Sequence, residues 1–124
     1  MKLENKKKLI FSSGIIITIF ILDRLSKLYI LNIAEIHNTV DIYITKYLNI
    51  YLVWNEGIAF GLLTFDQSNM YNLISCLIII ISILVLILII KTNDIRFYFY
   101  SFIFGGAIGN LFDRIYYSAV PDFI

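Results

Sequence analysis

Residues 77–90 read LIIIISILVLILII, fourteen residues with one serine and no charged side chain. They belong to a longer apolar stretch from Met70 to Ile90. A helix that crosses a hydrocarbon core of ~30 Å needs roughly 20 mostly apolar residues, so this stretch predicts a membrane-spanning helix. The whole chain of 124 residues is 60% hydrophobic and only 15% charged, which lies outside the usual composition of a soluble domain. The composition therefore predicts a membrane protein and excludes a soluble enzyme.

Two further apolar stretches accompany this one, at about residues 9–31 and 95–112. The first follows a basic N-terminus, as a secretory signal peptide would. No small-residue cleavage site follows Leu22, and apolar residues resume after Lys27, so a membrane helix is the better interpretation. We expect a single membrane domain over residues 1–124 with three spans at about 9–31, 70–90 and 95–112.

The stretch between the first and second spans, residues 32–69, is polar and rich in Tyr, Ile and Thr. Apolar and polar residues alternate around residues 42–45 and 49–54, a pattern typical of short β-strands. We expect a small extracytoplasmic β-sheet here, on the membrane surface. The predicted fold class is a mainly α membrane protein with three transmembrane helices and this β-sheet.

The orientation in the membrane follows from the basic residues near the helix ends. Six of them lie at the N-terminus and in the turn between the second and third spans, which places these segments in the cytoplasm: Lys2, Lys6, Lys7, Lys8, Lys91 and Arg96. Four lie on the opposite side: Arg24, Lys27, Lys46 and Arg114. This topology brings Asp23, Asp113 and Asp122 to one level, the outer leaflet and its interface.

Asp23 is expected inside the membrane, where a carboxylate costs on the order of 2.5–3.5 kcal/mol. Lys27 lies one helical turn later, at i+4, so the two side chains can pair. Both a purely structural ion pair and a functional site explain an intramembrane aspartate in this position.

Further polar residues lie near the expected outer surface. Asn55 precedes Gly57, a spacing typical of a turn, although a carboxamide there could also hold a peptide backbone. Asn110 and Asp113 share one helix face, and Asp122 follows among apolar neighbours. Nearby carboxylates in such surroundings have pKa values pushed apart, as acid–base hydrolysis by an aspartate pair requires. The alternative, an ion pair of Arg114 with either aspartate, does not account for Asn55 and Asn110.

Several other chemistries find no support in the residues. One cysteine, Cys76, and one histidine, His37, cannot form a metal site of three or four protein ligands, so no metal site is expected. No Gly-x-Ser-x-Gly motif is present, and serines within membrane helices commonly bond back to the helix backbone. A net charge of +1 gives no reason to expect nucleic acid as a partner.

Four motifs together resemble the lipoprotein signal peptidases, also called signal peptidase II, the membrane aspartyl proteases of bacteria. The chain contains, in the family's order, residues 23–27 (Asp-x-x-Ser-Lys), 55–61 (Asn-x-Gly-x-Ala-Phe-Gly), 105–114 (Gly-Gly-Ala-x-Gly-Asn-x-x-Asp-Arg) and 120–123 (Val-Pro-Asp-Phe). The family counterpart of the last motif is Val-Val-Asp-Phe. The resemblance covers nearly the whole chain.

The resemblance implies removal of signal peptides from diacylglyceryl-modified prolipoproteins, without metal or cofactor. The reaction would take place at the outer face of the bacterial cytoplasmic membrane, in a multi-pass protein surrounded by membrane lipids. Asp122 matches one of two catalytic aspartates. The following residues match positions that support the site or contact substrate: Asp23, Lys27, Asn55, Gly57, Asn110, Asp113 and Arg114.

The family pattern continues into a fourth helix with a Phe-Asn-x-Ala-Asp motif, whose aspartate completes the catalytic pair. These 124 residues do not contain that motif, so we expect a truncated form that inserts but does not cleave. Gly105 and Gly109 form a Gly-x-x-x-Gly pattern that allows close helix packing, and we expect their face to lack its fourth neighbour. The alternative function is a non-catalytic small membrane protein acting in helix association or lipopeptide binding.

Overall fold

The computed structural model describes residues 3–55 and 68–123. These described residues form three helices and four short strands. In chain order they are α1 (Leu3–His37), β1 (Asp41–Thr45), β2 (Leu48–Tyr51), β3 (Val53–Asn55), α2 (Ser68–Lys91), α3 (Arg96–Tyr117) and β4 (Val120–Asp122).

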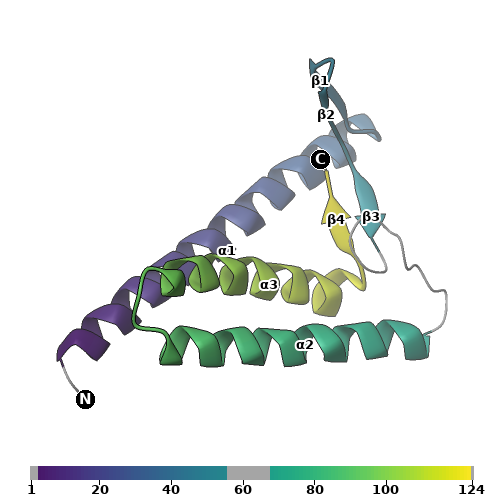
Figure 1. Ribbon diagram of the computed structural model, residues 1–124. Coiled ribbons are helices and arrows are strands. Elements are labelled where there is room, and N and C mark those ends of the chain that lie inside the picture. Colours follow the sequence, from purple (N-terminus) through teal and green to yellow (C-terminus); the bar gives the residue numbers. More distant parts are fainter. Residues whose placement is uncertain (1–2, 56–67, 124) are drawn as a thin grey trace.

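Helix α3 lies between the other two helices and contacts both (Figure 1). Helix α1 crosses α3 obliquely. A short turn joins α2 to α3, and these two helices run side by side. Within the described residues, two helical stretches are long and apolar enough to cross a membrane, Glu4–His37 and Asn72–Lys91. The predicted class, mostly helical with membrane helices and small sheets, is confirmed.

Small residues allow the close packing of α1 against α3. A Cβ built on Gly105 would lie 2.9 Å from the Cβ of Ile19, and one built on Gly109 would lie 2.5 Å from Oδ2 of Asp23. The hydroxyls of Ser12 and Ser101 form a buried hydrogen bond of 2.7 Å between the same two helices. The expectation that the glycine face lacks its neighbour is therefore wrong, because α1 of the same chain packs against it.

Helix α1 is longer than the span expected from the sequence and includes residues 32–37, which were expected in the β-rich stretch. The predicted span ends at Leu31 because the apolar run ends there. The backbone, however, remains helical for almost two more turns. The helix ends before Asn38, whose φ of 58° is a left-handed conformation that asparagine tolerates.

The four strands form two separate antiparallel pairs. Strand β1 pairs with β2, with Ile42 opposite Ile50. Strand β3 pairs with β4, with Val53 opposite Asp122 and Asn55 opposite Val120. The second pair joins residues that are 65 to 69 positions apart in the sequence. Strand β4 follows α3, and Figure 1 shows the pair beside the end of that helix.

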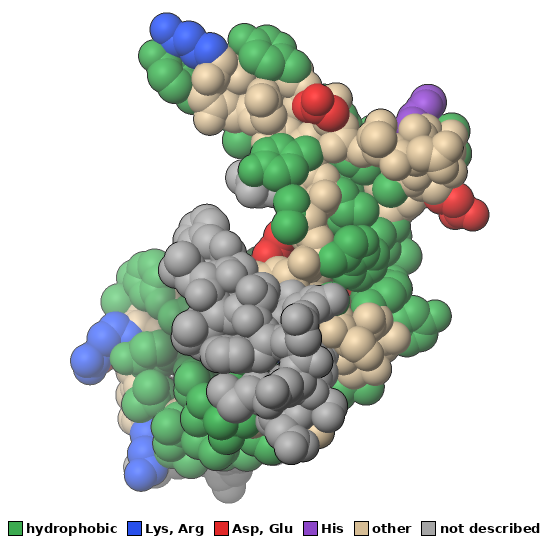
Figure 2. Space-filling model, turned by 90° about the vertical axis from the view of Figure 1, so that its right-hand side faces the viewer, with side chains coloured by type: hydrophobic (Ala, Val, Ile, Leu, Met, Phe, Trp, Pro, Cys, Tyr) green, Lys and Arg blue, Asp and Glu red, His purple; other side chains and the backbone are tan. Residues whose placement is uncertain are grey.

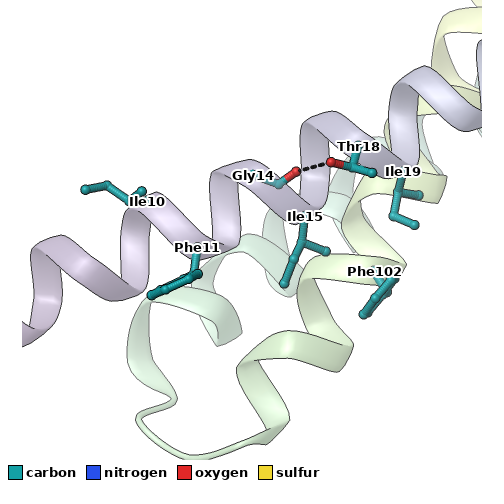
Figure 3. A pocket seen from close by; sticks show the side chains of 7 residues that line it. All are labelled: Ile10, Phe11, Gly14, Ile15, Thr18, Ile19 and Phe102. Atoms are coloured by element: carbon teal, nitrogen blue, oxygen red, sulfur yellow. Dashed lines mark hydrogen bonds between the residues drawn. The ribbon is translucent and has the colours of Figure 1, made fainter.

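Hydrophobic side chains cover much of the helical surface (Figure 2). Many large ones are exposed on all three helices, among them Ile10, Leu84 and Phe99. A groove of about 450 Å³ between α1 and α3 is lined almost wholly by such residues (Figure 3). In it, the hydroxyl of Thr18 donates a hydrogen bond to the carbonyl oxygen of Gly14, which satisfies that polar side chain in apolar surroundings.

The start of α1 is tied to the turn between α2 and α3. Nζ of Lys8 donates to the carbonyl oxygen of Ile90 at 2.8 Å and to Oδ1 of Asn93 at 3.3 Å. In the same turn, the exposed guanidinium of Arg96 bonds to the carboxylate of Asp94 and lowers the pKa of that carboxyl to about 2. Lys8, in the basic start of α1, therefore lies beside the turn that Lys91 and Arg96 flank.

Candidate active site

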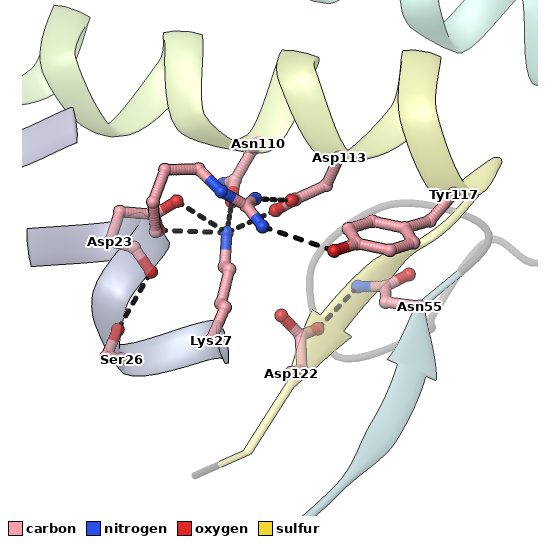
Figure 4. Close-up of polar contacts among 9 residues, drawn as sticks. Asp23, Ser26, Lys27, Asn55, Asn110, Asp113, Tyr117 and Asp122 are labelled. Carbon is pink, nitrogen blue, oxygen red and sulfur yellow. Dashed lines mark hydrogen bonds and ion pairs between the residues drawn. The ribbon is translucent and has the colours of Figure 1, made fainter. Parts of the chain in front are cut away.

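Lys27 is the centre of a polar cluster between α1 and α3 (Figure 4). Its ammonium group donates to Oδ2 of Asp23 at 2.9 Å, to Oδ1 of Asn110 at 3.0 Å and to Oδ2 of Asp113. Lys27 is only 4% exposed and Asp113 is fully buried. A charge buried this deeply requires an opposite charge and full hydrogen bonding, and the cluster provides both.

Arg24, which precedes Lys27 by three residues on α1, is a further member of this cluster. Its guanidinium pairs with Oδ1 of Asp113, the oxygen not used by Lys27, and donates to the hydroxyl of Tyr117 at 3.4 Å. It also lies over the ring of Phe112, 4.6 Å from the centroid. Arg24, Lys27, Asp23 and Asp113 form a group of two cations and two carboxylates, so the charges within this group balance.

Asp122 lies in a second polar group on the strands. Nδ2 of Asn55, in β3, donates to Oδ2 of Asp122, in β4, at 3.0 Å. In the antiparallel register Asn55 lies opposite Val120 and Asp122 lies opposite Val53, so the two side chains are diagonal neighbours on the strand pair. Asn55 is buried and Asp122 is partly exposed, so the bond fixes a carboxylate at the edge of the molecule.

Tyr117 lies between the two polar groups (Figure 4). It is the last residue of α3, and Ser118, with a φ of 61°, ends the helix and directs the chain into β4. The ring of Tyr117 packs on the ring of Trp54, with centroids 5.5 Å apart. Trp54 precedes Asn55 in β3, so this contact joins the end of α3 to the strands.

The structure brings most of the predicted site residues together in two neighbouring groups. Asp23, Lys27, Asn110 and Asp113 are in the helical cluster, whereas Asn55 and Asp122 are in the strand pair. Arg114 is buried at the end of α3, beside Asp113 in the sequence. Gly57 lies outside the described residues.

The structure also answers the alternatives considered from the sequence. Asp23 does pair with Lys27, with 2.8 Å between Nζ and Oδ1, but that pair is part of a larger cluster. The cations that pair with Asp113 come from α1, namely Arg24 and Lys27. No group of metal-ligating side chains occurs in the part of the chain that the structure describes.

Two of the serines within the helices, Ser82 and Ser101, bond back to the helix as expected, whereas the buried hydroxyl of Ser75 has no hydrogen-bond partner among the described residues. The hydroxyls of Ser82 and Ser101 each donate at 2.7 Å to the carbonyl oxygen four residues earlier. Such a bond satisfies the hydroxyl within its own helix, so the proton of the hydroxyl is not held by a side-chain base that could activate it as a nucleophile.

Sequence reasoning missed Arg24 and Tyr117 as members of the site. The available signal was the position of Arg24, directly after an aspartate inside an apolar stretch, where an unpaired cation is as costly as an unpaired carboxylate. Tyr117 gave no comparable signal, since tyrosines are common at membrane interfaces.

Comparisons with known proteins agree on one family. Residues 15–124 match the family model described as signal peptidase (SPase) II. The chain is 51% identical over 120 residues to a lipoprotein signal peptidase of Pelagibacter ubique, covering 97% of this chain and 72% of the relative. It is 42% identical over 115 residues to a lipoprotein signal peptidase of Rickettsia bellii, covering 91% of this chain and 58% of the relative.

A solved structure agrees with this result. It is described as a bacterial membrane enzyme, shares 26% identity with this chain and superposes with a TM-score of 0.65. The match covers 91% of this chain and 68% of that one. The four motifs predicted the family correctly: this membrane protein belongs to the signal peptidase II family of lipoprotein signal peptidases.

Proposed function

We propose that this chain forms most of the site of an aspartic endopeptidase that removes signal peptides from diacylglyceryl-modified prolipoproteins. Asp122 is one catalytic aspartate in this proposal. The observation that carries it is the hydrogen bond from Asn55 to Asp122, which orients the carboxylate through its Oδ2. A reacting carboxylate needs such fixed geometry in order to activate a water molecule or protonate a leaving group.

The helical cluster supports this site in the proposal. Lys27 joins Asp23, on its own helix, to Asn110 and Asp113 on α3. These bonds fix α1 against the last turns of α3, which lead directly into β4 and Asp122. Arg114 and Gly57, which match family motif positions, complete the supporting residues.

Hydrolysis by carboxylates needs a second acidic group, one to activate water and one to protonate the amine. In the family pattern this second group is the aspartate of the Phe-Asn-x-Ala-Asp motif. Asp113 is unsuited to the role, because it is fully buried and both of its oxygens accept bonds from cations.

We further propose that α3 spans the membrane with α1 and α2, and that the N-terminus lies in the cytoplasm. The bond of Lys8 to Ile90 places the basic N-terminus beside the basic turn between α2 and α3. Basic residues gathered at one end are typical of the cytoplasmic side. The strands and Asp122, near the other ends of the helices, then face the outside of the cytoplasmic membrane, where the lipid-modified substrate is located.

The test uses a chimera in which residues 1–124 replace the matching part of the Pelagibacter ubique relative. The purified chimera is incubated with a diacylglyceryl-modified prolipoprotein, and the product is followed by mass. Asp122→Asn should lower the rate by ~100-fold or more, the scale of general acid–base catalysis, because the amide cannot exchange a proton. Asp94→Asn, the same change in the exposed turn, should leave the rate unchanged. Full activity in Asp122→Asn contradicts the proposal.

A further inference from the structure

Arg24 bonds to two residues of α3 that lie in different parts of the site. Its guanidinium pairs with Asp113 in the buried cluster and donates to the hydroxyl of Tyr117, in the last turn of the helix. The guanidinium is also 5.7 Å from the centroid of the Tyr117 ring. The side chain is only 12% exposed, so these contacts replace water around the charge.

Lys27 does not make the same connection. Its bonds go to Asp23, Asn110 and Asp113, all within the packing of α1 on α3. A guanidinium is planar and presents several N–H groups in a fixed fork, so it can hold a carboxylate and a phenol together. An ammonium group at position 24 would supply the charge but not this fixed geometry.

Tyr117 carries the connection onward to the strands. Its ring packs on Trp54, which lies opposite Pro121 in the pairing of β3 with β4. The neighbours of these two residues are Asn55 and Asp122, which share the hydrogen bond of 3.0 Å. A continuous series of contacts therefore leads from Arg24 on α1 to Asp122 on β4.

We infer that Arg24 is a positioning residue that acts through Tyr117 and Trp54 to set the position of Asp122. The inference rests on the proposed function only for its effect on catalysis. Its structural part is independent, because Arg24 should hold the β3–β4 pair in place whatever reaction takes place there.

The structural part is tested on the 124-residue chain by the fluorescence of Trp54, the single tryptophan. Arg24→Lys keeps the charge, and Tyr117→Phe removes only the hydroxyl. Both should shift the Trp54 emission to longer wavelength and increase its quenching by acrylamide, because the ring of residue 117 is released. The matched controls are Arg96→Lys, at the exposed start of α3, and Tyr116→Phe, which removes a hydroxyl from an exposed residue and keeps its ring beside that of Tyr117. Emission and quenching equal to those of the controls would overturn the inference.

The catalytic part is tested in the chimera described above. Each of the two variants should lower kcat by about two- to tenfold, as loss of one hydrogen bond does, with KM within about twofold. The double variant should be no slower than the slower single variant, because both changes break one connection.

The possible outcomes separate the two proposals. If Arg24→Lys has the wild-type kcat, Arg24 acts only through its charge. If Tyr117→Phe has the wild-type kcat while Arg24→Lys does not, Arg24 acts only through Asp113. Either result overturns the inference and leaves the role of Asp122 intact. If Asp122→Asn is active, the proposed function fails, and the Trp54 measurements still decide whether Arg24 positions the strands. If Arg24→Lys fails to fold in a thermal melt, Tyr117→Phe alone decides.

Discussion

Gly109 lies so close to Asp23 that a Cβ built on the glycine would be 2.5 Å from Oδ2 and 2.8 Å from Cγ of that carboxylate. The carboxylate in turn accepts a hydrogen bond from Lys27. The absence of a side chain at position 109 thus has two consequences. It allows α1 to approach α3, and it leaves room for the polar cluster that joins them.

Gly109→Ala should therefore destabilise the folded chain by about 1–3 kcal/mol, the usual effect of overpacking, because Asp23 must move away from Lys27. The measurement is unfolding of the purified chain in detergent. Gly106→Ala is the matched control, since a Cβ there meets nothing within 4 Å and alanine favours the helix. Equal stability of the two variants would show that the close approach is not required.

Lys27→Met should lower the free energy of unfolding by about 3–5 kcal/mol, the scale for removing one partner of a buried ion pair. The apolar side chain fills similar space but leaves Asp23 without its ion-pair partner and Asp113 with Arg24 alone. Lys46→Met, an exposed lysine in the turn between β1 and β2, should change the stability by less than about 0.5 kcal/mol. A small effect at Lys27 would mean that the cluster contributes little to folding.

The helices, the family and most members of the two polar groups could be predicted from the sequence, because apolar runs and costly intramembrane polar groups are local signals. The partner of the Gly105 and Gly109 face could not be predicted. A Gly-x-x-x-Gly pattern shows that a helix can approach closely, but not which one. The pairing of β3 with β4 was also missed, since three-residue strands have too short a pattern to be recognised and their register is set by tertiary contacts.

Arg24 is a second example, within the site, of a residue whose partners could not be predicted from the sequence. Its neighbour Asp23 could be interpreted from the sequence together with Lys27, because residues at i and i+4 meet on one helix. The partners of Arg24 are on α3, 89 and 93 positions later, and only the crossing of the two helices brings them together.

The proposed orientation predicts which exposed residues can be reached from outside an intact cell. In a Cys76→Ala background, a cysteine at Asn38 should react with a membrane-impermeant thiol reagent, and one at Asn93 should react only after the membrane is opened. Both side chains are exposed in the structure, so accessibility depends on the side of the membrane. Labelling at Asn93 but not at Asn38 in intact cells would reverse the topology.

The last prediction concerns the hydrogen bond between Asn55 and Asp122, in the chimera that contains residues 1–124. Asn55→Ala should lower kcat by roughly ten- to a hundredfold, the equivalent of one hydrogen bond to a charged group, because the carboxylate loses the donor that orients its Oδ2. KM should change less than kcat if Asn55 acts mainly on Asp122 rather than on the substrate. Asn49→Ala, an exposed asparagine on β2, is the control and should behave as the wild type. Asn55→Asp should be slower still, because it places a second carboxylate within about 3 Å of the first, where the two repel. A wild-type kcat in Asn55→Ala would show that Asp122 reaches its position without this bond, and the strand pairing alone would then have to hold it.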